Sequence, residues 1–102
     1  MKEEQDRKDV LEEYGMVEQK VVIKNPTGLH LRPAGILCKE AVKYKSKITF
    51  EFRGGTANAK SVLSVLGACI KSGDSITFIC EGEDETEALK AMVGAVESGL
   101  GE

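Results

Sequence analysis

Residues 48–53 alternate strictly between apolar and polar side chains, and this alternation constrains the fold more than any other feature of the sequence. The apolar positions are Ile48, Phe50 and Phe52, and the polar positions are Thr49, Glu51 and Arg53. Side chains of a strand point alternately to opposite faces, so this period predicts a strand with one buried and one hydrated face. The pair Gly54-Gly55 then indicates a hairpin turn into a short strand near residues 56–59. The chain is therefore expected to build a sheet that is covered on one side and partly wet on the other.

The remaining patterns predict two more strands and three helices. Residues 17–25 alternate loosely, and residues 76–81 are apolar on most of both faces, which indicates strands. Helical spacing predicts helices near residues 31–43, at residues 62–66 and from residue 84 or 86 onward. Their apolar positions are Ala34, Leu37, Cys38 and Ala41, then Val62, Leu63, Val65 and Leu66, then Leu89, Met92, Val93 and Val96. The order β-α-β-β-α-β-α predicts an α+β open-faced β-sandwich, a four-stranded antiparallel sheet with three helices on one face.

Length and charge limit the organisation and the classes of partner. A chain of 102 residues makes one domain, and its net charge of −3 with 5% aromatic residues argues against a nucleic-acid binder. Residues 1–15 hold six acidic and three basic residues, so residues 16–102 are formally neutral. We expect an acidic, frayed or disordered N-terminal extension over residues 1–15 and one domain over residues 16–102. No apolar run approaches ~18 residues, so we expect a cytoplasmic protein without membrane insertion.

Three cysteines, Cys38, Cys69 and Cys80, form neither a CxxC motif nor a metal-binding spacing. An odd and widely spaced set is typical of reduced thiols rather than of a disulfide framework. We expect all three to be packing residues, and we expect no metal site and no cofactor.

The single histidine, His30, lies between a turn-forming stretch and the start of a helix. Residues 25–34 read Asn-Pro-Thr-Gly-Leu-His-Leu-Arg-Pro-Ala. A neutral imidazole is a nucleophile near neutral pH, while Arg32 and the free N–H groups of a first helical turn suit phosphate oxygens. Thr27 can fix the loop through a local hydrogen bond, and Gly28 permits an unusual backbone angle. The alternative is a surface histidine ahead of a helix, but no neighbouring group activates water, so a group carrier fits better than a hydrolase.

These residues resemble the histidine-containing phosphocarrier protein (HPr) family of the bacterial phosphoenolpyruvate-dependent sugar phosphotransferase system. The resemblance is carried by residues 27–34 (TGLHLRPA), residues 58–67 (NAKSVLSVLG) and residues 97–102 (ESGLGE). It implies a carrier rather than an enzyme, in which His30 accepts a phosphoryl group on Nδ1 from phosphorylated enzyme I. The group then passes to an enzyme II A domain, with Arg32 stabilising the phosphate. Leu31 replaces the alanine that is common in the family, and we expect it to alter partner docking more than chemistry.

The second motif places Ser61 at the start of a short helix. Taken alone, Ser61 is a helix N-cap. The resemblance adds phosphorylation by an HPr kinase/phosphorylase, which would create a site for a catabolite-control transcription factor and weaken transfer from enzyme I. Because so short a helix cannot bury all its apolar residues, we expect a docking patch formed by Val62, Leu63 and Leu66.

Two other functions stay open at this point. One is a mainly regulatory HPr-like co-effector of the transcription factor, although such members of the family typically lack the histidine that this chain has. The other is a phosphocarrier of the nitrogen-related branch of the system. Whichever of the three functions applies, we expect a monomer with no direct nucleic-acid contact.

Overall fold

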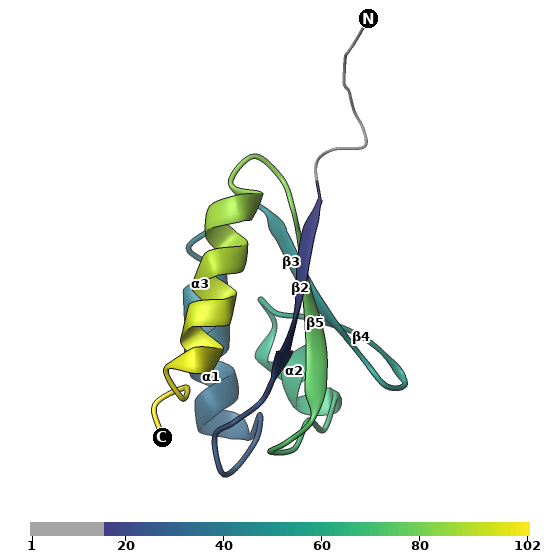
Figure 1. Ribbon diagram of the computed structural model, residues 1–102, viewed down its shortest axis with the longest axis vertical. Coiled ribbons are helices and arrows are strands. Elements are labelled where there is room, and N and C mark those ends of the chain that lie inside the picture. The colour runs from purple at the N-terminus through teal and green to yellow at the C-terminus, as the bar shows by residue number, and fades with distance from the viewer. Residues whose placement is uncertain (1–15) are drawn as a thin grey trace, which may run out of the picture.

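The computed structural model describes residues 16–102 and forms one sheet with helices packed against it (Figure 1). The expected extension over residues 1–15 lies outside the described residues. Along the chain the elements are β2 (Val17–Val22), α1 (Leu31–Ala41), β3 (Lys47–Phe52), β4 (Gly55–Asn58), α2 (Val62–Gly67), β5 (Ser75–Glu81) and α3 (Glu85–Glu97). This order confirms the predicted β-α-β-β-α-β-α arrangement and the α+β open-faced sandwich.

The four described strands lie in the order β2-β5-β3-β4, and all three neighbouring pairs are antiparallel. The register pairs Val21 with Ile76 and Phe50 with Phe78, so the buried side chains of adjacent strands stand on the same face. Phe50 and Phe78 contact each other edge to face, with ring centroids 5.9 Å apart. Such pairs add about 0.5–1.5 kcal/mol beyond the burial of their surface.

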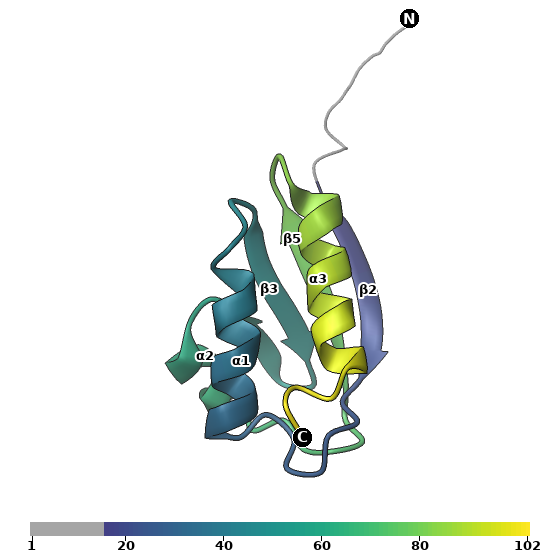
Figure 2. The same cartoon turned by 90° about the vertical axis from the view of Figure 1, so that its left-hand side faces the viewer.

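Helices α1 and α3 lie side by side across the covered face of the sheet (Figure 2). The predicted apolar positions Ala34, Leu37, Cys38 and Ala41 of α1 are all buried. In α3, Met92 and Val96 are buried, whereas the other two predicted positions are half-buried. No helix of the described residues is long and apolar enough to cross a membrane.

Three boundaries differ from the predictions. The first strand ends at Val22 rather than near residue 25, because Ile23 exchanges main-chain hydrogen bonds with Asp74 and Gly73 of a loop. Helix α1 ends at Ala41 rather than near residue 43, because the N–H groups of Lys43 and Tyr44 bond to carbonyl groups three residues earlier instead of four. The turn after β3 uses Gly54, while Gly55 already belongs to β4.

A second loop contact joins the start of α3 to the start of β3. Asp84 is the N-cap residue of α3, but its carboxylate does not cap that helix. It accepts hydrogen bonds from the main-chain N–H groups of Lys45 and Ser46, both 2.9 Å long, and from the Ser46 hydroxyl. These bonds hold the pKa of Asp84 at about 2, below its ordinary value.

Candidate functional site

His30 is the N-cap residue of α1, and its exposed side chain makes no capping hydrogen bond. Its backbone is extended (φ −71°, ψ −178°), which turns the chain from the preceding loop into the helix. The first bond of the helix runs from the Ala34 N–H to the His30 carbonyl at 2.8 Å. Since Pro33 has no N–H, the amides of Leu31 and Arg32 are the ones left at the positive end of this helix. His30 therefore directly precedes two main-chain donors.

Gly28 fixes the loop before His30 by allowing a close approach of two main chains. Its φ of +68° lies in the left-handed region, as the sequence predicted. A Cβ at this position would lie 2.5 Å from the carbonyl oxygen of Ile70 and 2.8 Å from Cα of Lys71. The next residue, Leu29, is buried and donates its N–H to the same Ile70 carbonyl at 3.0 Å. The position of His30 is thus tied to the segment that follows α2.

Glu102 holds the same loop from the other side, a role that the sequence patterns did not reveal. Its carboxylate accepts hydrogen bonds from the Thr27 hydroxyl (2.6 Å), the Thr27 N–H (3.2 Å) and Nδ2 of Asn25 (3.0 Å). Asn25 is buried, and its Nδ2 also donates to the Gly28 carbonyl at 2.7 Å. The expectation that Thr27 fixes the loop through a local bond is wrong, because its partner lies 75 residues away.

The hydrogen bonds from Thr27 and Asn25 hold the pKa of Glu102 below its ordinary value. The charge that His30 can carry contributes to this shift in the same direction, as the smallest of its causes. Glu102 is anchored by its neighbours, since Leu100 is buried and Gly101 passes so close to Ile36 that a Cβ would lie 2.6 Å from its Cδ1. Segment 99–102 therefore closes over the loop that carries the histidine.

A hollow of about 260 Å³ joins His30 to helix α2. Its wall includes Leu31, Leu66 and Lys71 in addition to the histidine. Leu31 is 69% exposed, so the side chain that departs from the family pattern points outward beside the imidazole. The structure thus brings together His30 and Leu66 of the predicted patch, and it adds the exposed cation Lys71, which the motif did not indicate.

Arg32 is exposed and forms no salt bridge or side-chain hydrogen bond within residues 16–102. Its guanidinium is thus available to an incoming anion, as is the exposed ammonium of Lys71 on the wall of the hollow. Lys71 thus shares the hollow with the exposed imidazole, and Arg32 lies in the first turn of the helix that His30 precedes. This combination is suited to a doubly charged phosphoryl group.

Ser61 is the N-cap residue of α2, as predicted, and its Oγ accepts a hydrogen bond from the Ser64 N–H at 3.2 Å. The preceding Lys60 is occupied, because its Nζ donates to the Tyr44 carbonyl at 2.7 Å. Of the four apolar residues of α2, Val65 is buried and Leu63 is 82% exposed, while the other two are intermediate. Of the predicted patch, only Leu63 is therefore fully exposed, and α2 packs against α1.

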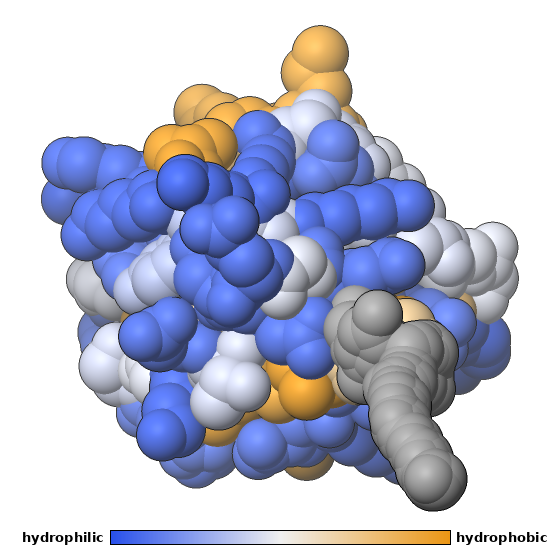
Figure 3. Space-filling view, turned by 90° about the horizontal axis from the view of Figure 1, so that it is seen from above, coloured by the Kyte–Doolittle hydropathy of each residue, from blue (hydrophilic) through white to orange (hydrophobic). Residues whose placement is uncertain are grey.

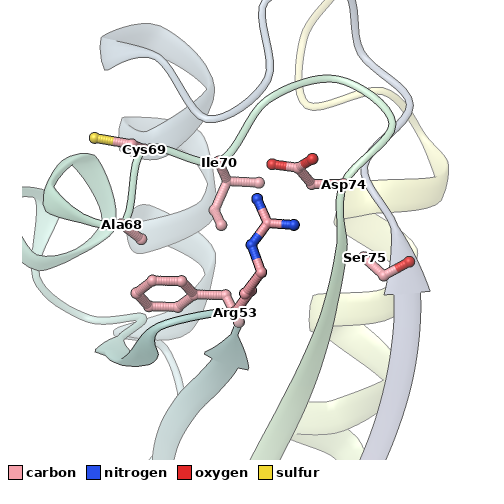
Figure 4. Close-up of a pocket in the computed structure, with 7 residues that line it drawn as sticks. Arg53, Ala68, Cys69, Ile70, Asp74 and Ser75 are labelled. Carbon is pink, nitrogen blue, oxygen red and sulfur yellow. The ribbon is translucent and has the colours of Figure 1, made fainter.

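A second hollow, of about 280 Å³, lies on the other side of the segment that follows α2. Cys69 and Ile70 line both hollows. In this one the guanidinium of Arg53 extends between Ile70 and Asp74 (Figure 4). The Asp74 carboxylate already accepts a hydrogen bond from the Lys71 N–H at 2.9 Å. The residues that line this hollow include no histidine, so it offers no second phosphoryl-accepting imidazole.

The cysteines differ in their environments. All three are free thiols; Cys38 and Cys80 are buried in the core, and burial raises the pKa of Cys80 to about 11. Cys69 is exposed and has a left-handed backbone (φ +55°), so the expectation that all three are packing residues is wrong for Cys69. Within residues 16–102, no group of three or more His, Cys, Asp or Glu side chains could hold a metal ion.

Comparison with known proteins identifies the family. A family model described as the PTS HPr component phosphorylation site matches residues 17–98. The HPr-like protein Crh of Halalkalibacterium halodurans is 43% identical over 82 residues, which cover 80% of this chain and 98% of Crh. The phosphocarrier protein HPr of Mycoplasma pneumoniae is 41% identical, with coverage of 80% and 94%. A crystal structure of HPr from Thermoanaerobacter tengcongensis superimposes with a TM-score of 0.81 at 40% identity, covering 84% of this chain and 97% of that one.

The fold and these matches define a small α+β carrier domain of the sugar phosphotransferase system. The chain belongs to the HPr family, which includes the phosphocarrier protein HPr and the HPr-like protein Crh.

Proposed function

We propose that this protein carries a phosphoryl group on His30 between enzyme I and enzyme II A domains during sugar uptake. The observation that supports this proposal most directly is the exposed, uncapped imidazole at the N-terminus of α1, with Arg32 and Lys71 free of carboxylate partners within residues 16–102. A loose phosphoryl-transfer transition state needs positioning and charge neutralisation more than covalent help, and this site provides both.

In the proposed step, the lone pair of His30 Nδ1 attacks the phosphorus held by enzyme I. The new N–P bond forms as the bond from phosphorus to enzyme I breaks, and the ring proton stays on Nε2. Arg32 and the first amides of α1 bind the phosphoryl oxygens. Gly28 and Glu102 act by positioning, because they hold the loop that ends at His30. A nucleophile of the enzyme II A domain then attacks the phosphorus, and the N–P bond breaks as the new bond forms, which leaves His30 neutral again.

We also propose that phosphorylation of Ser61 regulates this transfer. A phosphate on Ser61 would lie on the helix that carries the exposed Leu63 and lines the His30 hollow through Leu66. Its negative charge would oppose docking of enzyme I, and we expect transfer to slow by on the order of tenfold or more. It would also offer a site to an arginine-bearing transcription factor.

A mainly regulatory function is the second candidate, and the 43% identity to an HPr-like Crh protein favours it. His30 separates the two functions, since a purely regulatory member has no use for a phosphorylatable imidazole. A carrier of the nitrogen-related branch would share the chemistry at His30, but it would fail to restore sugar uptake in a strain that lacks HPr.

The proposal is tested by incubating the protein with enzyme I and labelled phosphoenolpyruvate. We expect acid-labile label in the wild type and in Ser61→Ala, and none in His30→Ala. Label that appears equally in His30→Ala would refute the carrier function. Label from ATP and the serine kinase alone, with none from enzyme I, would establish the regulatory function instead. Sedimentation velocity of the same samples tests the expected monomer.

A further inference from the structure

A hydrophobic groove of about 400 Å³ runs between strand β2 and helix α3. Val17, Leu89 and Val93 supply its apolar walls, and Gln19 and Lys90 lie on its polar rim. The groove shares no lining residue with the His30 hollow. The end of the molecule at which β2 and α3 begin is otherwise mostly hydrophilic, with hydrophobic surface confined to separate patches (Figure 3). The groove therefore needs an explanation other than phosphoryl transfer.

The groove adjoins an unpaired edge of the sheet. Strand β2 forms one of the two edges of the sheet, and no other strand of residues 16–102 pairs with its outer side. An open edge presents free main-chain N–H and C=O groups, and natural sheets commonly protect such an edge with a helix or a loop. An occupant of the groove would cover this edge as well.

The chain itself supplies an occupant of matching size. Residues 1–15 precede Met16, which directly adjoins the groove residue Val17. Apart from Met1, the only sizeable apolar side chains of this segment are Val10, Leu11 and Tyr14. Their spacing of i, i+1 and i+4 places all three on one face of a helix.

The apolar stripe on the segment and the apolar stripe of the groove have the same length. Val10 and Tyr14 are four residues apart, as are Leu89 and Val93, and four helical residues rise about 6 Å. Between Tyr14 and Val17 the chain has Gly15, which tolerates the sharp reversal that docking requires. The segment carries a net charge of −3, while Lys90 on the rim forms no salt bridge within residues 16–102.

We propose that residues 10–14 turn back at Gly15 and dock in the groove between β2 and α3, with Val10, Leu11 and Tyr14 against Leu89 and Val93. The acidic residues of the segment then face solvent and Lys90. This docking covers the outer edge of β2 and leaves the His30 face open.

Isotope-labelled full-length protein tests the proposal by NMR. We expect intramolecular NOEs from the Tyr14 ring to the methyl groups of Leu89 and Val93. The double variant V10N/L11N should lose these NOEs, and its β2 amides should exchange with solvent about tenfold faster. Val42→Asn is the matched control, because Val42 is 58% exposed and does not line the groove, so the NOEs should persist.

Charge reversal on the rim gives a second measurement. Lys90→Glu should weaken the NOEs, whereas Lys39→Glu, an exposed lysine in α1, should leave them unchanged. Random-coil shifts and no NOEs for residues 10–14, as expected of a frayed extension, would overturn the proposal. Intermolecular NOEs together with a dimer in sedimentation would overturn it too, because the occupant would then be a second copy.

Discussion

Replacement of Gly28 by alanine should destabilise the protein strongly, although it adds one methyl group. The added Cβ would lie 2.5 Å from the Ile70 carbonyl oxygen and 2.8 Å from Cα of Lys71, and neither main-chain atom can rotate away. At φ +68° an alanine also costs about 1–2 kcal/mol relative to its preferred conformations. If the loop moves to relieve the overlap, it loses the hydrogen bond from Leu29 to Ile70, worth about 1 kcal/mol. We therefore expect the free energy of unfolding to fall by about 2–4 kcal/mol.

Gly35→Ala is the matched control, because it makes the same chemical change in the interior of α1. No atom lies within 4 Å of the Cβ that this substitution adds, outside the immediate backbone of the helix. Alanine is favoured over glycine in a helix by up to about 1 kcal/mol, so this variant should be as stable as the wild type or more so. Urea unfolding of both variants measures the difference.

The two glycine variants should also differ in activity. Because the Gly28 loop leads directly to His30, Gly28→Ala should lower the rate of phosphorylation by enzyme I under conditions where the variant is still folded. A Gly28→Ala protein within about 0.5 kcal/mol of the wild type would refute the argument from close main-chain approach. An equal loss of stability in Gly28→Ala and Gly35→Ala would refute it too.

Four further predictions concern single side chains. Since the pKa of Asp84 is about 2 in the folded protein, against an ordinary 3.8, this carboxylate stabilises the fold above pH 3.8 and that contribution is lost as the pH falls toward 2. Asp84→Asn should therefore unfold at lower urea concentration at pH 7 and show a shallower loss of stability between pH 5 and 2. Ser61→Ala should lose about 1 kcal/mol of stability with its N-cap, measured by urea unfolding. Leu63→Ala should change the free energy of unfolding by less than about 0.5 kcal/mol, because the side chain is 82% exposed. The same variant should raise the KM that enzyme I shows for this protein, and an unchanged KM would mean that Leu63 is not part of the docking surface. Glu102→Gln should weaken the hydrogen bonds to Thr27 and should broaden or shift the NMR signals of residues 25–28. Unchanged signals would show that the carboxylate does not hold the loop.

Sequence patterns predicted those helices and strands of this fold that are determined by neighbouring residues in the chain. The alternation through Phe50 and the helical spacing through Leu37 depend only on which face is buried, and both residues are fully buried. The N-cap at Ser61 likewise depends on a hydrogen bond within three residues. Element ends were less predictable, because β2 ends at Val22 where Ile23 bonds to a loop some 50 residues later.

The parts of the site that sequence patterns missed are held by long-range contacts. Glu102 bonds to Thr27 across 75 residues, and no spacing rule connects the two. Lys71 reaches the His30 hollow only because Gly28 lets the two main chains meet. A hint was available for Gly28, since a glycine beside the motif indicates either a positive φ or a close approach. In this structure both causes apply.

We propose above all that His30 accepts a phosphoryl group and transfers it to an enzyme II A domain. The most direct measurement is to phosphorylate the protein with enzyme I and labelled phosphoenolpyruvate, remove both, add a purified enzyme II A domain, and follow the label. We expect acid-labile label to leave the wild-type protein and to appear on the enzyme II A domain, and we expect His30→Ala protein to carry none at any stage. Label that stays on the protein, or that transfers equally from the His30→Ala variant, would contradict it.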